Sequence, residues 1–156
     1  PFQDNPLLNA EQILERVQQD LRAFIGRTAF EDLCRQWVVA QGRNGKLSFT
    51  PMAVGSYWSK RVQVDVVAID WDNKKLLLGE CKWGMDKIDR QVARDLIQEK
   101  APKILLDLPE MGRGWKVQCV LFGRKGFTDA AKNEMRDVGG FCVDVKQIDA
   151  VLEKVE

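Results

Sequence analysis

Three charged side chains, Asp65, Glu80 and Lys82, lie in two otherwise apolar stretches on either side of a turn-forming segment, residues 71–75. Both stretches are rich in β-branched and aliphatic residues, so we expect the two strands of a hairpin. A two-residue turn at 72–73, or a four-residue loop, would oppose Asp65 to Glu80 with their Cβ atoms roughly 5 Å apart. Carboxylates that close repel each other unless one is protonated or a cation lies between them. A divalent metal ion is the simplest compensation.

Two alternatives to this interpretation stay open from the sequence. A three-residue loop would oppose Asp65 to Cys81 and turn Glu80 to the other face of the sheet, because side chains alternate along a strand. The two carboxylates could also be held without a metal, in a structural ion-pair cluster with Lys82, Arg61 or another cation.

Composition limits the chemistry that this chain can perform. The 24 Lys and Arg residues nearly balance 23 Asp and Glu, so a net charge of +1 gives no global sign of nucleic-acid binding and any such surface must be local. The sequence has no histidine, which excludes Ser-His and Cys-His nucleophilic machinery and the common zinc sites. If the protein is a hydrolase, carboxylates, lysine and a hard metal ion must do the chemistry.

The length of the chain and the spacing of its cysteines indicate its number of domains and its cellular compartment. At 156 residues we expect one domain over 1–156, with a helical N-terminal segment over about 9–40. The sequence begins without Met, so we expect a fragment of a larger protein. It contains no apolar run of membrane-spanning length and no signal peptide, and we expect a cytoplasmic protein without membrane contact. Four widely spaced cysteines in apolar surroundings predict buried thiols rather than a zinc site: Cys34, Cys81, Cys119 and Cys142.

The order of predicted elements favours an α/β fold. Apolar residues at helical spacing predict a first helix to about residue 25, which Gly26 interrupts before a capping box at 28–31 opens a second. Helices between the later strands predict a mixed sheet with helices packed on it. The other expected helices cover 86–107, with Asp86 as N-cap and a kink near Pro102, then 128–138 and 147–154; the other expected strands lie near 53–58, 115–122 and 141–145.

The hairpin belongs to a wider pattern that resembles a known superfamily. Glu31 in an early helix, the segment 55–58, the Val-Asp pair that ends at Asp65 and the tetrapeptide Glu-Cys-Lys-Trp at 80–83 resemble the restriction-endonuclease-like superfamily and its PD-(D/E)XK signature. Val64 stands where that motif has Pro. More narrowly, the chain is similar to the domain of unknown function at the C-terminal end of archaeal-type AAA ATPases. The resemblance implies a restriction-endonuclease-like mixed β-sheet flanked by helices, and an upstream ATPase domain as a partner.

The resemblance also implies an activity and roles for particular residues. Asp65 and Glu80, with the backbone carbonyl of Cys81, would bind Mg²⁺ or Mn²⁺ through hard oxygen ligands. The metal would activate a phosphodiester, and Lys82 would orient the attacking water or neutralise developing charge. This is the chemistry of a nuclease, which we expect to act on DNA. Two further residues match auxiliary positions of the family, Glu31 and Gln91.

A row of polar residues follows the hairpin. Lys87, Arg90, Gln91 and Arg94 are spaced to form one ridge of a helix, which could grip phosphates or could be a solvated face. Trp58 and Trp83 could stack on bases or roof a core. Two other classes of function stay open: a catalytically idle module that binds nucleic acid or a partner for an ATPase, and an oligomerisation domain that associates through its apolar first helix.

Overall fold

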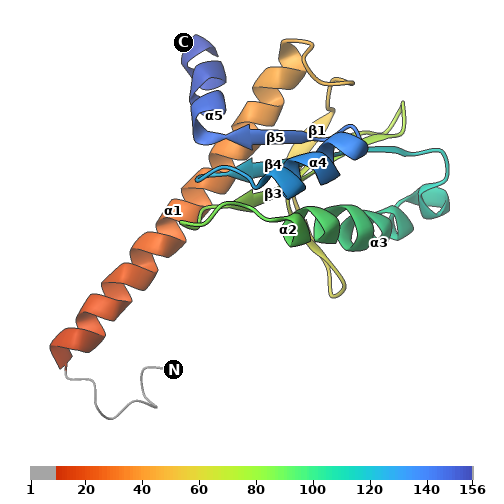
Figure 1. Ribbon diagram of the computed structural model, residues 1–156. Helices are drawn as coiled ribbons and strands as arrows, with labels where there is room; N and C mark the ends of the chain where they lie inside the picture. Colours follow the sequence, from red (N-terminus) through yellow and green to blue (C-terminus); the bar gives the residue numbers. More distant parts are fainter. Residues whose placement is uncertain (1–9, 156) are drawn as a thin grey trace.

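The protein, represented by a computed structural model that describes residues 10–155, is built on one five-stranded mixed sheet with strand order β1-β2-β3-β4-β5 (Figure 1). The first three strands form an antiparallel meander, and β4 and β5 continue the sheet in parallel with β3. Helical crossovers connect the parallel strands, as this geometry requires. The strands are β1 (Ala53–Trp58), β2 (Gln63–Asp70), β3 (Lys75–Lys82), β4 (Lys116–Gly123) and β5 (Phe141–Asp144).

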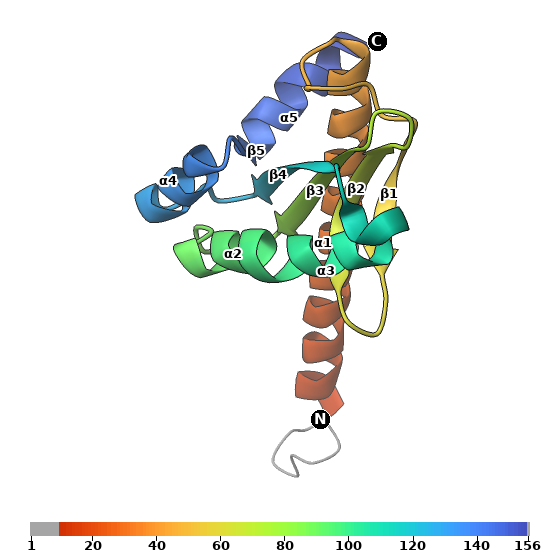
Figure 2. The same ribbon diagram turned by 90° about the vertical axis from the view of Figure 1, so that its right-hand side faces the viewer.

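Helices cover both faces of the sheet and confirm the predicted α/β class with a mixed sheet flanked by helices (Figure 2). The segment from α2 to α3 packs with α4 on one face, over a core that includes Leu78, Leu96 and Leu121. On the other face α1 and α5 pack over a core that includes Phe30 and Phe122. The helices are α1 (Ala10–Arg43), α2 (Arg90–Arg94), the π-helical η2 (Asp95–Lys100), α3 (Ala101–Asp107), η3 (Pro109–Gly112), α4 (Asp129–Asp137), α5 (Val145–Leu152) and η4 (Glu153–Val155).

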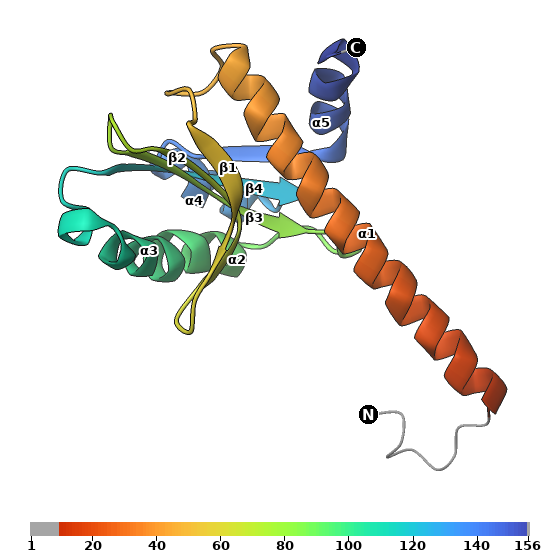
Figure 3. The ribbon, with the colours of Figure 1, turned by 180° about the vertical axis from the view of Figure 1, so that it is seen from behind.

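The prediction of two N-terminal helices separated at Gly26 is wrong, because α1 is one continuous helix of 34 residues. Gly26 serves a packing contact: a Cβ atom at this position would lie 2.5 Å from Nε1 of Trp83. The buried residues of α1 begin at Phe30, and the helix before it projects away from the sheet (Figure 3). Despite the length of α1, no helix within residues 10–155 is both long and apolar enough to cross a membrane.

The helix predicted from Asp86 starts later, at Arg90, with Asp89 as its N-cap. Ile88 forms an isolated parallel bridge with Phe127, which holds the preceding segment extended and prevents an earlier start. The disturbance expected at Pro102 takes the form of the π-helical turn η2 directly before it. Proline cannot donate a backbone hydrogen bond and its ring crowds the preceding turn, which a wider turn accommodates.

The hairpin of β2 and β3 has the predicted register. Its pairs run from Asp70 opposite Lys75 to Val66 opposite Gly79, which excludes the three-residue loop. The loop has four residues, 71–74, and the side chain of Asp70 stabilises it by accepting the backbone N–H groups of Asp72 and Asn73, both at 3.1 Å. This local hydrogen bonding fixes the alignment that the site depends on.

A β-bulge interrupts β2 where the site begins. Between the pairs Gly55–Val67 and Tyr57–Val64, β2 has one residue more than β1. Val64 accordingly belongs to the core under α2–α3, whereas Val66 belongs to the core under α1. A bulge breaks the alternation of side chains and re-aims those next to it. The residue between these two valines is Asp65.

The cysteines confirm the prediction of buried thiols. Cys34, Cys81 and Cys119 are buried, Cys142 is half-buried, and all four are free. Burial raises the pKa of the Cys119 thiol to about 11, which keeps it protonated and unreactive at neutral pH.

Close packing around Gly79 makes a first prediction. A Cβ atom there would lie 2.9 Å from Cβ of Val66, 3.0 Å from Cε2 of Phe122 and 3.1 Å from Cγ1 of Val120. We expect Gly79→Ala to lower the free energy of unfolding, measured in urea, by about 1–3 kcal/mol. Gly84→Ala is the matched control, because nothing lies within 4 Å of its Cβ position. Equal losses in the two variants would contradict this account of the sheet.

Candidate active site

The predicted site residues meet at the carboxyl end of β3, where the strand points toward α1 (Figure 3). Glu80 and Lys82 come from β3, Asp65 comes from the bulge in β2, and Glu31 comes from α1. Four polar groups from three elements are therefore placed by the hairpin register and by the crossing of α1 over the sheet.

The side chain of Asp65 accepts a backbone hydrogen bond from β3 where the regular pairing of β2 with β3 stops. The last regular pair of the hairpin is Val66 with Gly79, and beyond it Oδ2 of Asp65 accepts the backbone N–H of Cys81 at 2.9 Å. The carbonyl oxygen of Asp65 accepts a hydrogen bond from Nη1 of Arg35 on α1, at 3.0 Å. The hydrogen bond from Cys81 holds the carboxylate against β3 through Oδ2, and the one from Arg35 ties the backbone of Asp65 to α1.

Glu80 is a carboxylate buried in the sheet, with 7% of its surface exposed. Its Oε2 accepts a hydrogen bond from Nζ of Lys100, in η2, at 2.7 Å, and its Oε1 lies 3.6 Å from Nζ of Lys82. The alternative of a structural ion-pair cluster is therefore confirmed in part, because Glu80 pairs with Lys82 and with a further cation, Lys100. Arg61 takes no part in it, because it pairs with Asp107.

The two lysines that contact Glu80 do not fully compensate the negative charge of the site. Burial, and then the charge of Asp65, raise the pKa of Glu80 above its ordinary value, although Lys100 and Lys82 act in the opposite direction. Burial and the charge of Asp65 also raise the pKa of Glu31, against the effect of Arg35. Burial and a neighbouring carboxylate thus disfavour the charged forms of Glu80 and Glu31, and a cation would stabilise them.

The ligand atoms that the site offers are oxygens, which is the type that a hard divalent cation prefers. Mg²⁺ and Mn²⁺ prefer carboxylate and carbonyl oxygens, which Asp65, Glu80 and the backbone of Cys81 provide. Among residues 10–155 there is no ready-made cluster of three or more His, Cys, Asp or Glu side chains that could hold a metal. One oxygen of Glu80 is also engaged by Lys100, so a cation would share this carboxylate with Lys100 or displace it.

Lys100 is the site residue that sequence reasoning missed. It lies four residues after buried Leu96 and four before buried Ile104, on the inward ridge of its helix. A lysine on an apolar ridge is a signal that its charge has a buried partner, because unpaired charges are not buried. The partner itself is twenty residues earlier and could not be named from the sequence.

The predicted phosphate-gripping ridge is arranged differently from the expectation. Lys87 precedes α2, so the helical spacing proposed for it is wrong, and Gln91 is exposed in the first turn. Nε of Arg90 lies 3.4 Å and Nε of Arg94 lies 2.9 Å from the same oxygen of Glu134, on α4. These two arginines join α2 to α4.

The two tryptophans considered for base stacking differ in environment. Trp83 packs against Phe30, with ring centroids 5.2 Å apart, and Cζ of Arg124 lies 4.3 Å from its ring centroid. Trp58 is 78% exposed at the end of β1. Trp83 therefore roofs the core under α1, next to the site, whereas Trp58 is accessible.

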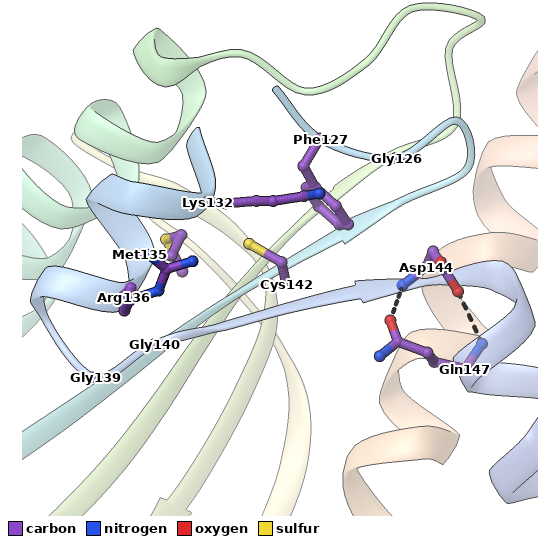
Figure 4. Close-up of a pocket in the computed structure, with 10 residues that line it drawn as sticks. All are labelled: Gly126, Phe127, Lys132, Met135, Arg136, Gly139, Gly140, Cys142, Asp144 and Gln147. Atoms are coloured by element: carbon purple, nitrogen blue, oxygen red, sulfur yellow. Dashed lines mark hydrogen bonds between the residues drawn. The ribbon is translucent and has the colours of Figure 1, made fainter. Parts of the chain in front are cut away.

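A cavity of about 570 Å³ lies elsewhere, between α4 and β5 (Figure 4). Its lining includes Lys132, Arg136 and Cys142 but none of the predicted site residues. The capping box that opens α5 lies at its border, where Asp144 and Gln147 exchange hydrogen bonds. This cavity is distinct from the carboxylate site.

The fold and the site define an α/β domain with a carboxylate–lysine cluster at the carboxyl end of the central strand of a mixed sheet. The chain belongs to the family described as archaea bacterial proteins of unknown function (DUF234), whose model matches residues 3–104. A curated relative, Uncharacterized protein MJECL04 of Methanocaldococcus jannaschii, is 25% identical over 88 residues, which are 55% of this chain and 20% of the relative. The chain thus spans about a fifth of the length of that relative.

Two solved structures are similar in fold. A repair endonuclease from Pyrococcus abyssi has 18% sequence identity and a TM-score of 0.48, with 74% of this chain and 46% of that chain covered. The protein of unknown function AF1548 has 19% identity and a TM-score of 0.46, with 79% of this chain and 66% of that chain covered. Both TM-scores lie below 0.5.

The raised pKa of Glu31 makes a prediction about stability. Ionised Glu31 costs more in the folded than in the unfolded protein, so its penalty develops as pH rises above 4.5 and is absent at lower pH. We expect Glu31→Gln to raise the melting temperature at pH 7, without divalent cations, by about one to three degrees. The gain should vanish near pH 4.

The matched control for this prediction is Asp32→Asn, which removes a neighbouring but exposed carboxylate of α1. We expect no comparable stabilisation from it. A lower melting temperature of Glu31→Gln at pH 7 would show that the ionised carboxylate does not destabilise the folded protein.

Proposed function

We propose that this protein is a metal-dependent phosphodiester hydrolase, a nuclease of the PD-(D/E)XK type that acts on DNA. The observation that carries the proposal is the grouping of Asp65, Glu80 and Lys82 at the end of β3. Asp65 is bound to the backbone next to Glu80, and Lys82 lies 3.6 Å from Glu80. A carboxylate whose pKa is raised by burial, and then by a second carboxylate, is costly to the fold, which favours a functional role.

The roles of the residues follow from their chemistry. Asp65, Glu80 and the carbonyl of Cys81 would hold Mg²⁺ or Mn²⁺, which when bound would polarise a phosphate oxygen. Lys82 is about half exposed, with 48% of its side chain accessible, so its ammonium group can reach an anionic phosphate or orient a water molecule. Glu31 would act as an auxiliary ligand, on the α1 side of the cluster.

Nucleic-acid contacts are proposed for the surface that continues from Lys82. Lys87 is exposed and free to contact a phosphate, as is Gln91 to donate a hydrogen bond. Arg90 and Arg94 would have to exchange the carboxylate of Glu134 for a phosphate, which is also an anion that arginine binds. We also propose that the domain works beside an ATPase domain; the greater length of its curated relative is compatible with such a neighbour.

A second candidate function is a catalytically idle module that binds nucleic acid or a partner. The specific observation that favours it is the 2.7 Å hydrogen bond from Lys100 to Glu80, which supplies a cation without any metal. The two candidates differ in whether a divalent ion can bind at Glu80.

Metal binding and cleavage separate the two candidates. We expect Mn²⁺ to bind to the wild type in calorimetry, and linear DNA to be cut when Mg²⁺ or Mn²⁺ is present. Asp65→Asn and Glu80→Gln should abolish metal binding, and asparagine keeps an acceptor for the N–H of Cys81. Lys82→Ala should retain metal binding but lower the rate of cleavage by about 10²-fold or more.

The matched control is Asp72→Asn, which removes an exposed carboxylate in the loop of the same hairpin. It should leave metal binding unchanged. Mn²⁺ binding that survives in both Asp65→Asn and Glu80→Gln, or cleavage at the wild-type rate in Lys82→Ala, would refute the proposed centre.

Lys100 makes a separate prediction about affinity. Because Lys100 and a divalent cation compete for Glu80, Lys100→Met should strengthen Mn²⁺ binding by roughly tenfold, since one nearby positive charge is worth about 1–2 kcal/mol. Lys103→Met, in the following helix α3 and paired with Glu99, should have no such effect. Weaker Mn²⁺ binding in Lys100→Met would show that Lys100 positions Glu80 for the metal instead of competing with it.

A further inference from the structure

The projecting part of α1 carries an apolar stripe that the proposed activity does not use. Its five large side chains are between 43% and 58% exposed, in a helix whose buried residues begin only at Phe30. Figures 1 and 3 both show this part of α1 extending away from the sheet. We define the stripe by these residues: Leu14, Val17, Leu21, Phe24 and Ile25.

The stripe stays exposed up to the point where the helix joins the body, with Phe24 55% and Ile25 56% exposed. Gly26 contacts Trp83, and residues two positions apart lie on nearly opposite sides of a helix. Phe24 therefore lies on the side opposite to Trp83. A helical segment of this length without tertiary packing is marginal in water, because most helical stability comes from burying an apolar face. The stripe thus needs a cover from outside residues 10–155.

The spacing of the stripe identifies the cover as another helix. Leu14, Val17, Leu21 and Phe24 are separated by three, four and three residues, which is the a/d pattern of a helix–helix seam. Thr28 continues the pattern, and after it come Glu31 and Arg35, where α1 reaches the sheet. The seam thus ends at the candidate site.

We propose that the stripe is the contact between two copies of this chain, paired through α1 in antiparallel orientation. The charges beside the seam are self-complementary: Asp20 and Arg27 lie seven residues apart on the same side of it. When Leu21 packs against Phe24 of the other copy, Asp20 of each copy lies beside Arg27 of the other. A two-fold symmetric contact of this kind satisfies both copies at once, which is the commonest geometry of homodimers. The inference is independent of the proposed nuclease activity.

The experiment is sedimentation equilibrium of the whole chain over a range of concentrations. We expect a reversible monomer–dimer equilibrium, and we expect Leu21→Ser to raise the dimer Kd by about tenfold or more. Gln19→Ser is the matched control, because Gln19 lies two residues from Leu21 on the far side of the helix. It should leave the Kd unchanged.

Charge exchange tests whether the cover is a second copy in this orientation. Asp20→Arg and Arg27→Asp should each raise the dimer Kd, and the double variant should restore it, because the exchanged pair re-forms between copies. Circular dichroism at 222 nm checks that each variant keeps its helix content. A wild type that stays monomeric at all concentrations, or a double variant that dimerises no better than the single ones, would overturn the proposal.

Discussion

The alignment of β2 with β3 is the constraint on which the candidate site depends. Asp70 fixes this alignment at the turn by accepting two backbone N–H groups, and Gly79 lets Val66 and Phe122 close around the strand. At the other end of the hairpin a bulge frees Asp65 from the regular ladder, and its carboxylate binds the backbone N–H of Cys81. A shift of one residue in the pairing of β2 with β3 would place Glu80 on the opposite face of the sheet, away from Asp65.

The second determinant is the negative charge that this alignment gathers. Glu80 is buried and contacts Lys100 and Lys82, yet the charge of Asp65 and the loss of water still raise its pKa. The folded structure therefore disfavours the ionised form of a carboxylate that it holds at the site. Shifted pKa values of this kind are common at sites that bind cations or perform acid–base chemistry. It is the physical link between the hairpin and the proposed hydrolysis.

Local features of the fold and the site could be predicted from the sequence, whereas long-range contacts could not. The hairpin register followed from a turn and two apolar stretches, and β1 has the predicted bounds. The bulge at Asp65 depends on β1 as well, so simple alternation overlooked it. Gly26 resembled a helix break because its contact, Trp83, lies far along the chain. Lys100 meets Glu80 only after η2 has packed on the sheet.

A crystal structure of the protein soaked in Mn²⁺ tests the central claim most directly. Anomalous scattering at the manganese absorption edge locates the ion without reference to activity. The account predicts one peak in contact with carboxylate oxygens of both Asp65 and Glu80 and with the carbonyl oxygen of Cys81. A map without a peak at these oxygens, with Nζ of Lys100 still bound to Glu80, would contradict it.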